Sequence, residues 1–593
     1  MCGELDTLYE RAHESLRLLC SRCLCFAPKE GLYPMNRWLI GLCIMVSATA
    51  CRRESRQPEE QVLVASATLT SAWIRNFNPF SPNALWPTRA GVYEPLLIYN
   101  TLTGRYVPWL ATSHRWSDDS LSLEFELRKD VQWSDGNGFD ADDVVFTFEL
   151  MKNHPALDTG SVWQRILGID KLAPHRVRFR LAHPDYPALP VLAHQMIVPE
   201  HIWVKVQAPS TFRNETPVGT GPYPIVGSFR TQLFELDKHP NYWKKEAVLA
   251  KKLRMPAYQG NDTVSLALVS GDIDWAGHNV PLIERTYIPR DPVHFKYWFP
   301  PLGGMVFLFA NTTRPPLDDA RVRKAISLAI DRNRLVKIGM SGYTQPADGT
   351  GLSPVYDRWK CCKTEAEALT RHNPNESQAL LRSAGCRKEK NQWTCQGKVL
   401  RFGLEVVNGW TDWIRSAQVI KQDLGAIGIH VQVKSYDFGA WFEHVQMGRF
   451  DLSIGWSNEG STPYEFYGGL ASSKTVKPVG QAGPTNWHRF ADKTFDMLLD
   501  TFASTPPGLK REQLVDQMQA RFIETLPAIP LFPNPSWGTY STRHFVGFPN
   551  AKKPYAKLSP HADPERLLLM TTIAPRTKNT SDGIADRTGA GGP

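Results

Sequence analysis

The chain has 593 residues, of which 42% are hydrophobic and 21% charged, and its formal net charge is +9. This composition is typical of a packed globular protein and argues against disorder over most of the length. At about 150 residues per domain, the length predicts three or four structural units. Basic residues are scattered among acidic ones with no run of five or more Lys or Arg, so nucleic acid is not an expected partner.

Residues 35–50 have the order of regions found in a secretory signal peptide. Arg37 is followed by an apolar stretch and then by small residues that end at Ala50. The apolar stretch is shorter than the about 20 residues that a transmembrane helix needs. We therefore predict export. Residues 1–34 precede this signal, and we attribute them to a start-site artefact, with translation beginning at Met35.

The signal ends at Cys51, where the sequence Ala-Thr-Ala-Cys resembles a bacterial lipobox. In a lipobox the Cys thiol carries a diacylglyceryl group, although the usual Leu three residues earlier is Ala48 here. The alternative is an ordinary cleaved signal with an incidental Cys. Residues 51–61 would then be a lipidated Cys and a charged, Pro-containing linker. We predict an extracytoplasmic protein, periplasmic or at the cell surface, anchored to the membrane at Cys51.

The placement of the cysteines also indicates an oxidising compartment. No Cys occurs between residues 52 and 360 or after residue 395. We expect disulfides in the remaining group, with Cys386 and Cys395 closing a polar turn, and Cys361 and Cys362 either bonding each other or pairing outward. A zinc site built from these four is the alternative, but two Cys-x-x-Cys pairs are lacking, so we predict no metal.

Beyond residue 62, the pattern of apolar residues predicts mixed strands and helices without an internal repeat. Residues 123–127 alternate apolar and polar side chains, as a half-buried strand does. Residues 142–151 and 320–331 have the spacing of helices. This mixture predicts an α/β fold. The tail, residues 573–593, has few large apolar side chains, and we expect it to be disordered.

The sequence lacks the motifs of the common enzyme classes. There is no Gly-rich loop ending in Gly-Lys-Ser/Thr, no Gly-x-Ser-x-Gly and no His-Glu-x-x-His. We therefore predict no catalytic residues and no cofactor, and no nucleotide hydrolysis by this chain.

Aromatic residues are the most distinctive feature, with 19 Trp, 18 Tyr and 27 Phe. Tryptophan suits clefts, because one face stacks on a ligand while the indole N–H finds a partner. Clusters occur around Trp73, around Trp410 and Trp413, and around Trp456. The alternative interpretation is aromatic packing between layers of the fold.

Five segments resemble the family-5 extracellular solute-binding proteins, which include the oligopeptide- and dipeptide-binding components of ABC importers. They follow the family order and span nearly all of the chain beyond residue 62. The segments are 127–146 (LRKDVQWSDGNGFDADDVVF), 217–223 (PVGTGPY), 241–243 (NYW), 321–332 (RVRKAISLAIDR) and 527–532 (PAIPLF).

The resemblance implies a two-lobed periplasmic-binding-protein-like fold (class II) with an additional inserted domain. It places lobe one at 62–92, 219–306 and 540–572, the inserted domain at 93–218, and lobe two at 307–539. The chain would cross between the lobes near residues 301–304 and 537–540, where Gly permits hinge dihedrals. Closure of the lobes around a ligand is the state that a membrane partner would recognise.

The resemblance also implies a binding loop. In peptide-binding members an acidic residue shortly after a Trp pairs with the amino terminus of the ligand, which points here to Glu459 after Trp456. Ser457 and Asn458 lie between them. Glu replaces the Asp of the peptide binders, and Ser453 stands where some of them have Arg. With Trp410 and Trp413, this loop is also similar to members that bind cello-oligosaccharides.

We therefore predict a non-enzymatic, monomeric binding protein that delivers oligopeptides to the permease subunits of an ABC importer. The predicted ligand-binding residues are Trp73, Trp410, Trp413, Trp456, Ser457, Asn458 and Glu459. Cello-oligosaccharide binding by the same fold is the alternative. A receptor that presents its ligand to a sensor is another.

Overall fold

The computed structural model describes residues 61–245, 247 and 250–576. The predicted signal peptide, the lipidation site Cys51, nearly all of the linker and residues 577–593 lie outside the described residues. The tail was predicted to begin at residue 573, which is too early. Ile573 is buried, and β23 (Ala574–Pro575) pairs antiparallel with β22 (Phe545–Val546).

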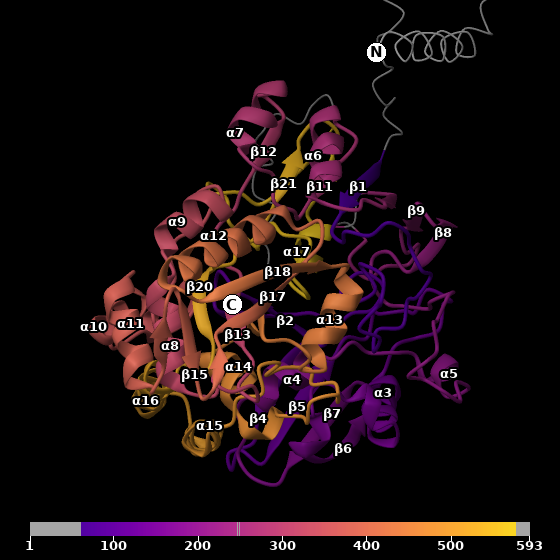
Figure 1. The fold of residues 1–593 in the computed structure, drawn as a ribbon. Helices are drawn as coiled ribbons and strands as arrows, with labels where there is room; N and C mark the ends of the chain where they lie inside the picture. Colours follow the sequence, from indigo (N-terminus) through magenta and orange to yellow (C-terminus); the bar gives the residue numbers. More distant parts are fainter. Residues whose placement is uncertain (1–60, 246, 248–249, 577–593) are drawn as a thin grey trace, which may run out of the picture. The chain divides into compact units, whose positions relative to one another are not determined.

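The first sheet has seven strands in the order β12-β21-β11-β1-β10-β9-β8, and we call the region around it lobe one. Strands distant in sequence lie side by side in it, as the indigo, magenta and yellow segments of Figure 1 show. The central strand β1 pairs in parallel with both β10 and β11. The strands are β1 (Val62–Ser66), β8 (Ile225–Arg230), β9 (Leu233–Asp237), β10 (Lys252–Pro256), β11 (Trp275–Ala276), β12 (Phe295–Tyr297) and β21 (Thr539–Ser541).

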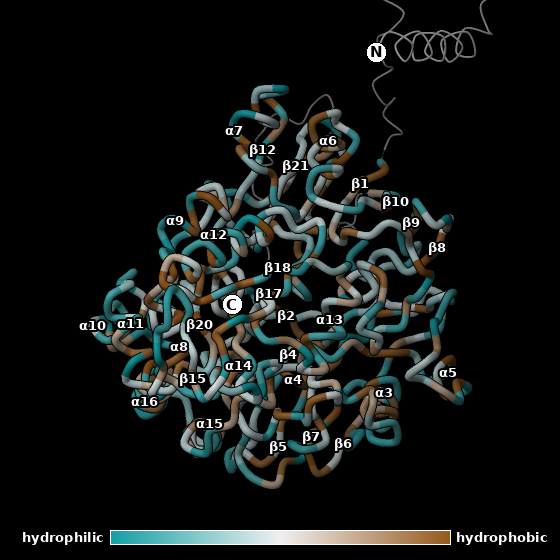
Figure 2. The backbone as a smooth tube through the Cα atoms, in the orientation of Figure 1, coloured by the Kyte–Doolittle hydropathy of each residue, from teal (hydrophilic) through white to brown (hydrophobic). Residues whose placement is uncertain are grey.

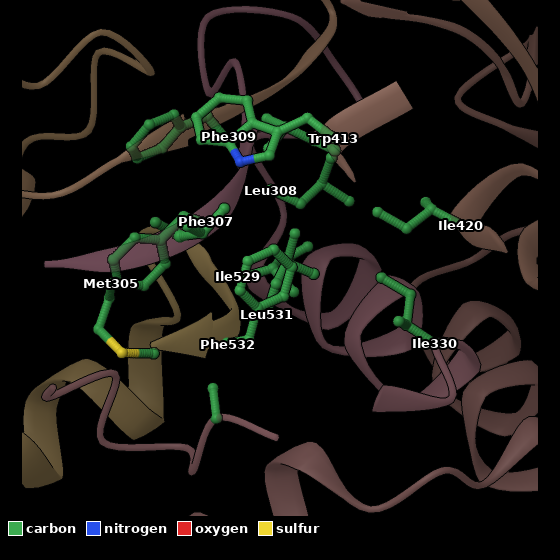
Figure 3. Packing of buried hydrophobic residues seen from close by; sticks show 14 of the residues in the cluster. Met305, Phe307, Leu308, Phe309, Ile330, Trp413, Ile420, Ile529, Leu531 and Phe532 are labelled. Atoms are coloured by element: carbon green, nitrogen blue, oxygen red, sulfur yellow. The ribbon is translucent and has the colours of Figure 1, made fainter. Parts of the chain in front are cut away.

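The second sheet has five strands in the order β18-β17-β19-β13-β20, and we call the region around it lobe two. Every residue of β13 is buried, as expected for an inner strand between β19 and β20. Figure 3 shows its Leu308 on the side of Ile529 and Leu531, with Ile420 beyond them, whereas Phe307 lies toward Met305. The strands are β13 (Met305–Ala310), β17 (Arg401–Val407), β18 (His430–Tyr436), β19 (Leu452–Trp456) and β20 (Ile529–Pro533).

A third sheet, β4-β5-β7-β6, lies between the first strand of lobe one and the rest of that lobe in the sequence. In β5 the burial of Leu123, Phe125 and Leu127 confirms the predicted alternation. Helix α3 begins with a capping box between Asp140 and Asp143, which confirms the predicted helix start. The strands are β4 (Ala111–Trp116), β5 (Ser122–Leu127), β6 (Ile166–Ala173) and β7 (Arg176–Leu181).

Helices accompany all three sheets, which confirms the predicted α/β class. In lobe one and the third-sheet region they are α3 (Ala141–Asn153), α4 (Ala188–Ala193), α5 (Glu200–Trp203), α6 (Asn261–Ser270), α7 (Ile283–Thr286) and α17 (Arg566–Met570). In lobe two they are α8 (Ala320–Ala329), α9 (Arg332–Gly339), α10 (Lys363–Thr370), α11 (Pro374–Ser383), α12 (Thr411–Ile427), α13 (Phe438–Gln446), α14 (Pro463–Ala471), α15 (Lys493–Ser504) and α16 (Leu509–Thr525). Three small sheets complete the described part of the fold. One is the β22–β23 pair, and the others are β2 (Leu97–Asn100) with β3 (Arg105–Pro108) and β14 (Arg387–Glu389) with β15 (Gln392–Cys395) and β16 (Lys398–Val399).

Hydrophobic and hydrophilic residues are interspersed along the tube in Figure 2. Within the described part of the chain, no helix has both the length and the apolar character needed to cross a membrane.

The chain passes from lobe one to β13 through Gly303 and Gly304, neither of which has a left-handed backbone. In this structure the close approach of neighbouring atoms, not an unusual dihedral, requires glycine. A Cβ added to Gly303 would lie 2.5 Å from the backbone oxygen of Asn534, on the segment that returns toward lobe one. The two passages between the lobes are therefore packed directly against each other.

Replacing Gly303 with Ala should destabilise the protein, because the added methyl group meets a backbone atom that cannot rotate away. We expect Gly303→Ala to lower the free energy of unfolding by about 1–3 kcal/mol, measured by urea unfolding. Gly425→Ala is the control, because this helical glycine in α12 has no atom within 4 Å of an added Cβ. The control should stabilise by about 0.5–1 kcal/mol. Equal effects of the two variants would contradict this account of the crossing.

Candidate ligand-binding site

Four partly exposed aromatic rings form one surface on lobe two, which we call the aromatic platform: Trp410, Phe438, Phe442 and Trp456. The ring of Trp456 is nearly parallel to Phe438 and Phe442, with centroids 6.5 and 6.2 Å away. Trp410 stacks on Phe438 at 5.9 Å. The platform therefore joins the loop before α12, one side of α13 and the end of β19.

Buried tryptophans support the platform from behind. Trp413 packs edge-on against Trp410 at 4.8 Å, and Trp441 lies 5.3 Å from Trp456. The indole N–H of Trp441 donates to Ser453 Oγ at 3.0 Å, so Ser453 serves the interior of lobe two. Satisfying the buried N–H lets these large rings pack without leaving a polar group unpaired.

The loop after Trp456 runs toward the crossing between the lobes. Two hydrogen bonds join Ser457 to Met305. The backbone N–H of Ser457 donates to the Met305 oxygen, and Oγ of Ser457 accepts from the Met305 backbone N–H, each at 2.9 Å. These bonds extend the pairing of β19 with β13. Asn458 and Glu459, the next two residues, are exposed. The predicted residues 456–459 thus lie at the edge of lobe two beside the crossing.

Both carboxylate oxygens of Glu459 have partners. Oε1 accepts from the backbone N–H of Gly304 at 2.8 Å, and Oε2 accepts from Nζ of Lys557 at 2.7 Å. Lys557 follows strand β21 in the sequence and belongs to lobe one, so this ion pair joins the two lobes. The Lys557 side chain is only 10% exposed, whereas that of Glu459 is 46% exposed.

The electrostatics around Lys557 favour its charged form. Burial acts against the ammonium, but the negative charges of Glu459 and Glu565 outweigh burial and raise the pKa of Lys557. Glu565 is itself buried and accepts a hydrogen bond from the backbone N–H of Lys557 at 3.0 Å. Lys557 is therefore a fixed positive charge on the wall of lobe one.

A second contact between the lobes lies beside the aromatic platform. The backbone N–H of Asn261, at the start of α6, donates to the Gly409 oxygen at 3.2 Å, and its side-chain amide donates to Asp412 Oδ1 at 3.3 Å. Asp412 is buried in the first turn of α12. Contacts between the lobes therefore occur near both Trp410 and Glu459.

The structure places Trp73 away from the other predicted site residues. Its side chain is 6% exposed and packs edge-on against Phe234, and its indole N–H donates to the Met255 oxygen at 3.0 Å. Trp73 thus belongs to the interior of lobe one.

The described residues contain two disulfide bonds. One joins Cys386 to Cys395 beside the β14–β15 hairpin, and the other joins Cys361 to Cys362 before α10.

A cavity of about 610 Å³ lies beside the crossing, and none of the predicted site residues line it. Its lining residues are Tyr297, Trp298, Phe299, Pro300, Pro301, Gly342, Tyr343, Thr344 and Gln345. Among the described residues, no group of three or more His, Cys, Asp or Glu side chains is arranged to hold a metal ion.

Three residues of this region were not predicted from the sequence: Phe438, Phe442 and Lys557. Phe438 and Phe442 have the i,i+4 spacing that puts two rings on one side of a helix, and this signal was present in the sequence. No sequence pattern pointed to Lys557, because its ion pair depends on a partner in the other lobe. Only the fold brings it to Glu459.

In this chain two lobes meet beside the aromatic platform, and this is the arrangement of a two-lobed binding protein. Residues 105–478, more than half of the chain, match the model of the bacterial extracellular solute-binding proteins, family 5 (middle region). The chain belongs to this family, which confirms the resemblance found in the sequence and its two-lobed α/β fold.

Individual relatives are distant in sequence but similar in fold. The probable ABC transporter periplasmic-binding protein SapA of Escherichia coli is 25% identical over 491 residues, which cover 78% of this chain and 85% of that protein. The periplasmic oligopeptide-binding protein of Thermotoga maritima, solved with mannohexaose, has a TM-score of 0.80 at 24% identity and covers 87% of this chain and 99% of its own. AppA of Bacillus subtilis, solved with a nonapeptide, has a TM-score of 0.72 at 18% identity, with 87% and 100% covered.

Asp412 should make stability depend on pH. Burial raises the pKa of its carboxyl group to about 6, so the folded protein favours the protonated acid. The contribution of Asp412 to the free energy of unfolding is therefore most favourable below about pH 4, falls as the pH rises toward about 6, and stays low above that. We expect Asp412→Asn to be more stable than the natural protein by about 1–3 kcal/mol at pH 7.5, and this gap should narrow at pH 4.5.

Urea unfolding at the two pH values measures this difference. The matched control is Asp262→Asn, which removes an exposed carboxylate from the first turn of α6 and should leave the pH dependence unchanged. Equal stability of Asp412→Asn and the natural protein at pH 7.5 would show that burial of Asp412 costs nothing.

Proposed function

We propose that the protein captures oligopeptides outside the cytoplasm and delivers them to an ABC importer by closure of its lobes around the ligand. The contact of Lys557 with Glu459 carries this proposal, because it brings the two lobes together beside the predicted binding loop. The family is one of bacterial extracellular solute-binding proteins, and we propose that this chain likewise binds its ligand without catalysing a reaction. Peptide delivery would need the permease subunits of the importer as partners, and we propose that the receptor acts as a monomer.

Several relatives support a peptide ligand. One is named a peptide transport periplasmic protein, SapA of Salmonella typhimurium, and AppA was solved with a nonapeptide. In this chain the ligand would lie along the platform residues Trp410 and Trp456, with Ser457, Asn458 and Glu459 at one end. Trp413 would support the platform from behind.

An oligosaccharide is the second candidate ligand. The Thermotoga maritima protein was solved with mannohexaose, and the partly exposed rings of Phe438, Phe442 and Trp456 are aromatic groups of the kind on which sugar rings stack. Peptide remains our primary proposal because more of the relatives are named for peptides.

We also propose that Cys51 carries a lipid and anchors the protein to the membrane. The support is the sequence alone, a short apolar signal ending in Ala-Thr-Ala-Cys. Natural protein should partition into detergent and gain the mass of a diacylglyceryl group on the fragment that begins at Cys51. A Cys51→Ala variant that partitions in the same way would overturn the anchor.

A thermal-shift screen separates the two ligand classes. A ligand present at 100 times its Kd stabilises the protein by about 2.7 kcal/mol, which raises the melting temperature measurably. We expect pools of di- to hexapeptides to raise it and cello-oligosaccharides to leave it unchanged. The reverse result would replace peptide by sugar as the ligand. Native mass spectrometry of protein purified without refolding would identify a retained ligand directly.

Removing the centre of the aromatic platform should weaken binding. We expect Trp456→Ala to reduce affinity for the ligand found in this screen about tenfold or more, because stacked area is lost from the middle of the surface. Trp163→Ala is the control, since this half-exposed tryptophan lies in the third-sheet region. Isothermal titration calorimetry measures both. Unchanged affinity of Trp456→Ala would place the ligand elsewhere.

A further inference from the structure

The ion pair between Lys557 and Glu459 already balances the negative charge of the carboxylate. One oxygen of Glu459 accepts from the Gly304 N–H at 2.8 Å, and the other accepts from the Lys557 ammonium at 2.7 Å. A ligand ammonium bound at Glu459 would lie within a few ångströms of Nζ. Two like charges at such a distance repel strongly, and more so where one of them is buried.

Lys557 cannot easily move aside for such a ligand. Its neighbours Ala556 and Leu558 are fully buried in the core of lobe one, and its backbone N–H is bound by buried Glu565. The Lys557 side chain is 10% exposed, so few water molecules can reach its ammonium to take the place of Glu459. The positive charge is therefore a permanent part of the wall that faces the binding loop.

The ammonium of Lys557 nevertheless has donors to offer. A lysine ammonium carries three N–H groups, and among the described residues Nζ donates one hydrogen bond, to Glu459. The other two N–H groups suit an oxygen acceptor such as a carbonyl or a carboxylate. The chemistry of this end of the site thus favours oxygen atoms and opposes cations.

We propose that Lys557 determines ligand specificity by binding an oxygen acceptor of the ligand and weakening the binding of ligands that would place a free ammonium at Glu459. The ligand class is then an extended molecule whose end at this site is uncharged or acidic, such as a peptide with an acylated amino end. This inference rests on the proposed function for the location of the site. It replaces the expectation that Glu459 binds the amino terminus of a peptide.

Paired ligands that differ only in acetylation of their amines test the proposal. One pair is a pool of Lys-free tetrapeptides with free amino ends and the same pool after acetylation. The other pair is the tetramer of glucosamine and the tetramer of N-acetylglucosamine. We expect the natural protein to bind the acetylated member of a pair at least about tenfold more tightly, equivalent to about 1.4 kcal/mol.

Three variants assign the preference to Lys557. Lys557→Met should abolish or reverse the preference, because it removes the competing charge and frees Glu459. Lys557→Arg should retain it. Lys553→Met is the matched control, since this exposed lysine lies four residues earlier and its loss should change nothing. If Lys557→Met fails to fold, the ratio of affinities for the acetylated and free-amino ligands, measured for the natural protein and for Lys557→Arg, still tests the proposal.

The outcomes separate this inference from the proposed function. Equal or tighter binding of the free-amino peptides overturns the role of Lys557 and leaves peptide binding standing. A preference for the acetylated sugar, with no peptide bound, supports Lys557 and overturns the peptide as ligand. If the folded protein binds neither peptide pool and neither sugar tetramer, the role of Lys557 and the proposed function are both overturned.

Discussion

The antiparallel pairing of β13 with β19 fixes the position of the crossing relative to the binding loop. In this register Val306 faces Trp456, and the hydrogen bonds of Ser457 with Met305 continue the ladder by one more residue. Successive side chains of a strand point to opposite faces, so a slip of one residue would exchange the positions of Trp456 and Ser457. The buried side chains of β13 oppose such a slip, because each would have to move to the opposite face of the sheet and repack in a core that is already filled. Gly304 and Glu459 meet as a consequence of this register.

The ion pair between the lobes is better suited to specificity than to stability. Burying the Lys557 ammonium carries a desolvation cost, and Glu459, at 46% exposure, is partly screened by water. The gain from the pair is therefore offset. What the pair does provide is a fixed arrangement of charge at one end of the platform. Removing Glu459 alone would leave a mostly buried ammonium with Glu565 as its remaining negative neighbour.

The sequence was sufficient for features that depend on local pattern. The alternation in β5 and the position of α3 follow from residues close together in the chain, whereas the contact of Trp410 with Trp456 arises from the fold. Trp73 illustrates the limit, because composition alone does not distinguish a tryptophan that faces a cleft from one buried beside Phe234. The partner of Glu459 lies 98 residues away in the other lobe. No pattern in the sequence encodes such a contact, since it arises only when both sheets have formed.

The contacts between the lobes have a further physical consequence. Asn261 with Asp412 and Lys557 with Glu459 both join lobe one to lobe two, and separating the lobes would break both sets of bonds. A ligand shifts an equilibrium between open and closed forms only by its difference in affinity for the two. Part of the free energy of closure therefore belongs to the protein itself. A ligand that adds acceptors for Lys557 strengthens the closed form, whereas one that competes for Glu459 must first overcome a contact that already holds it.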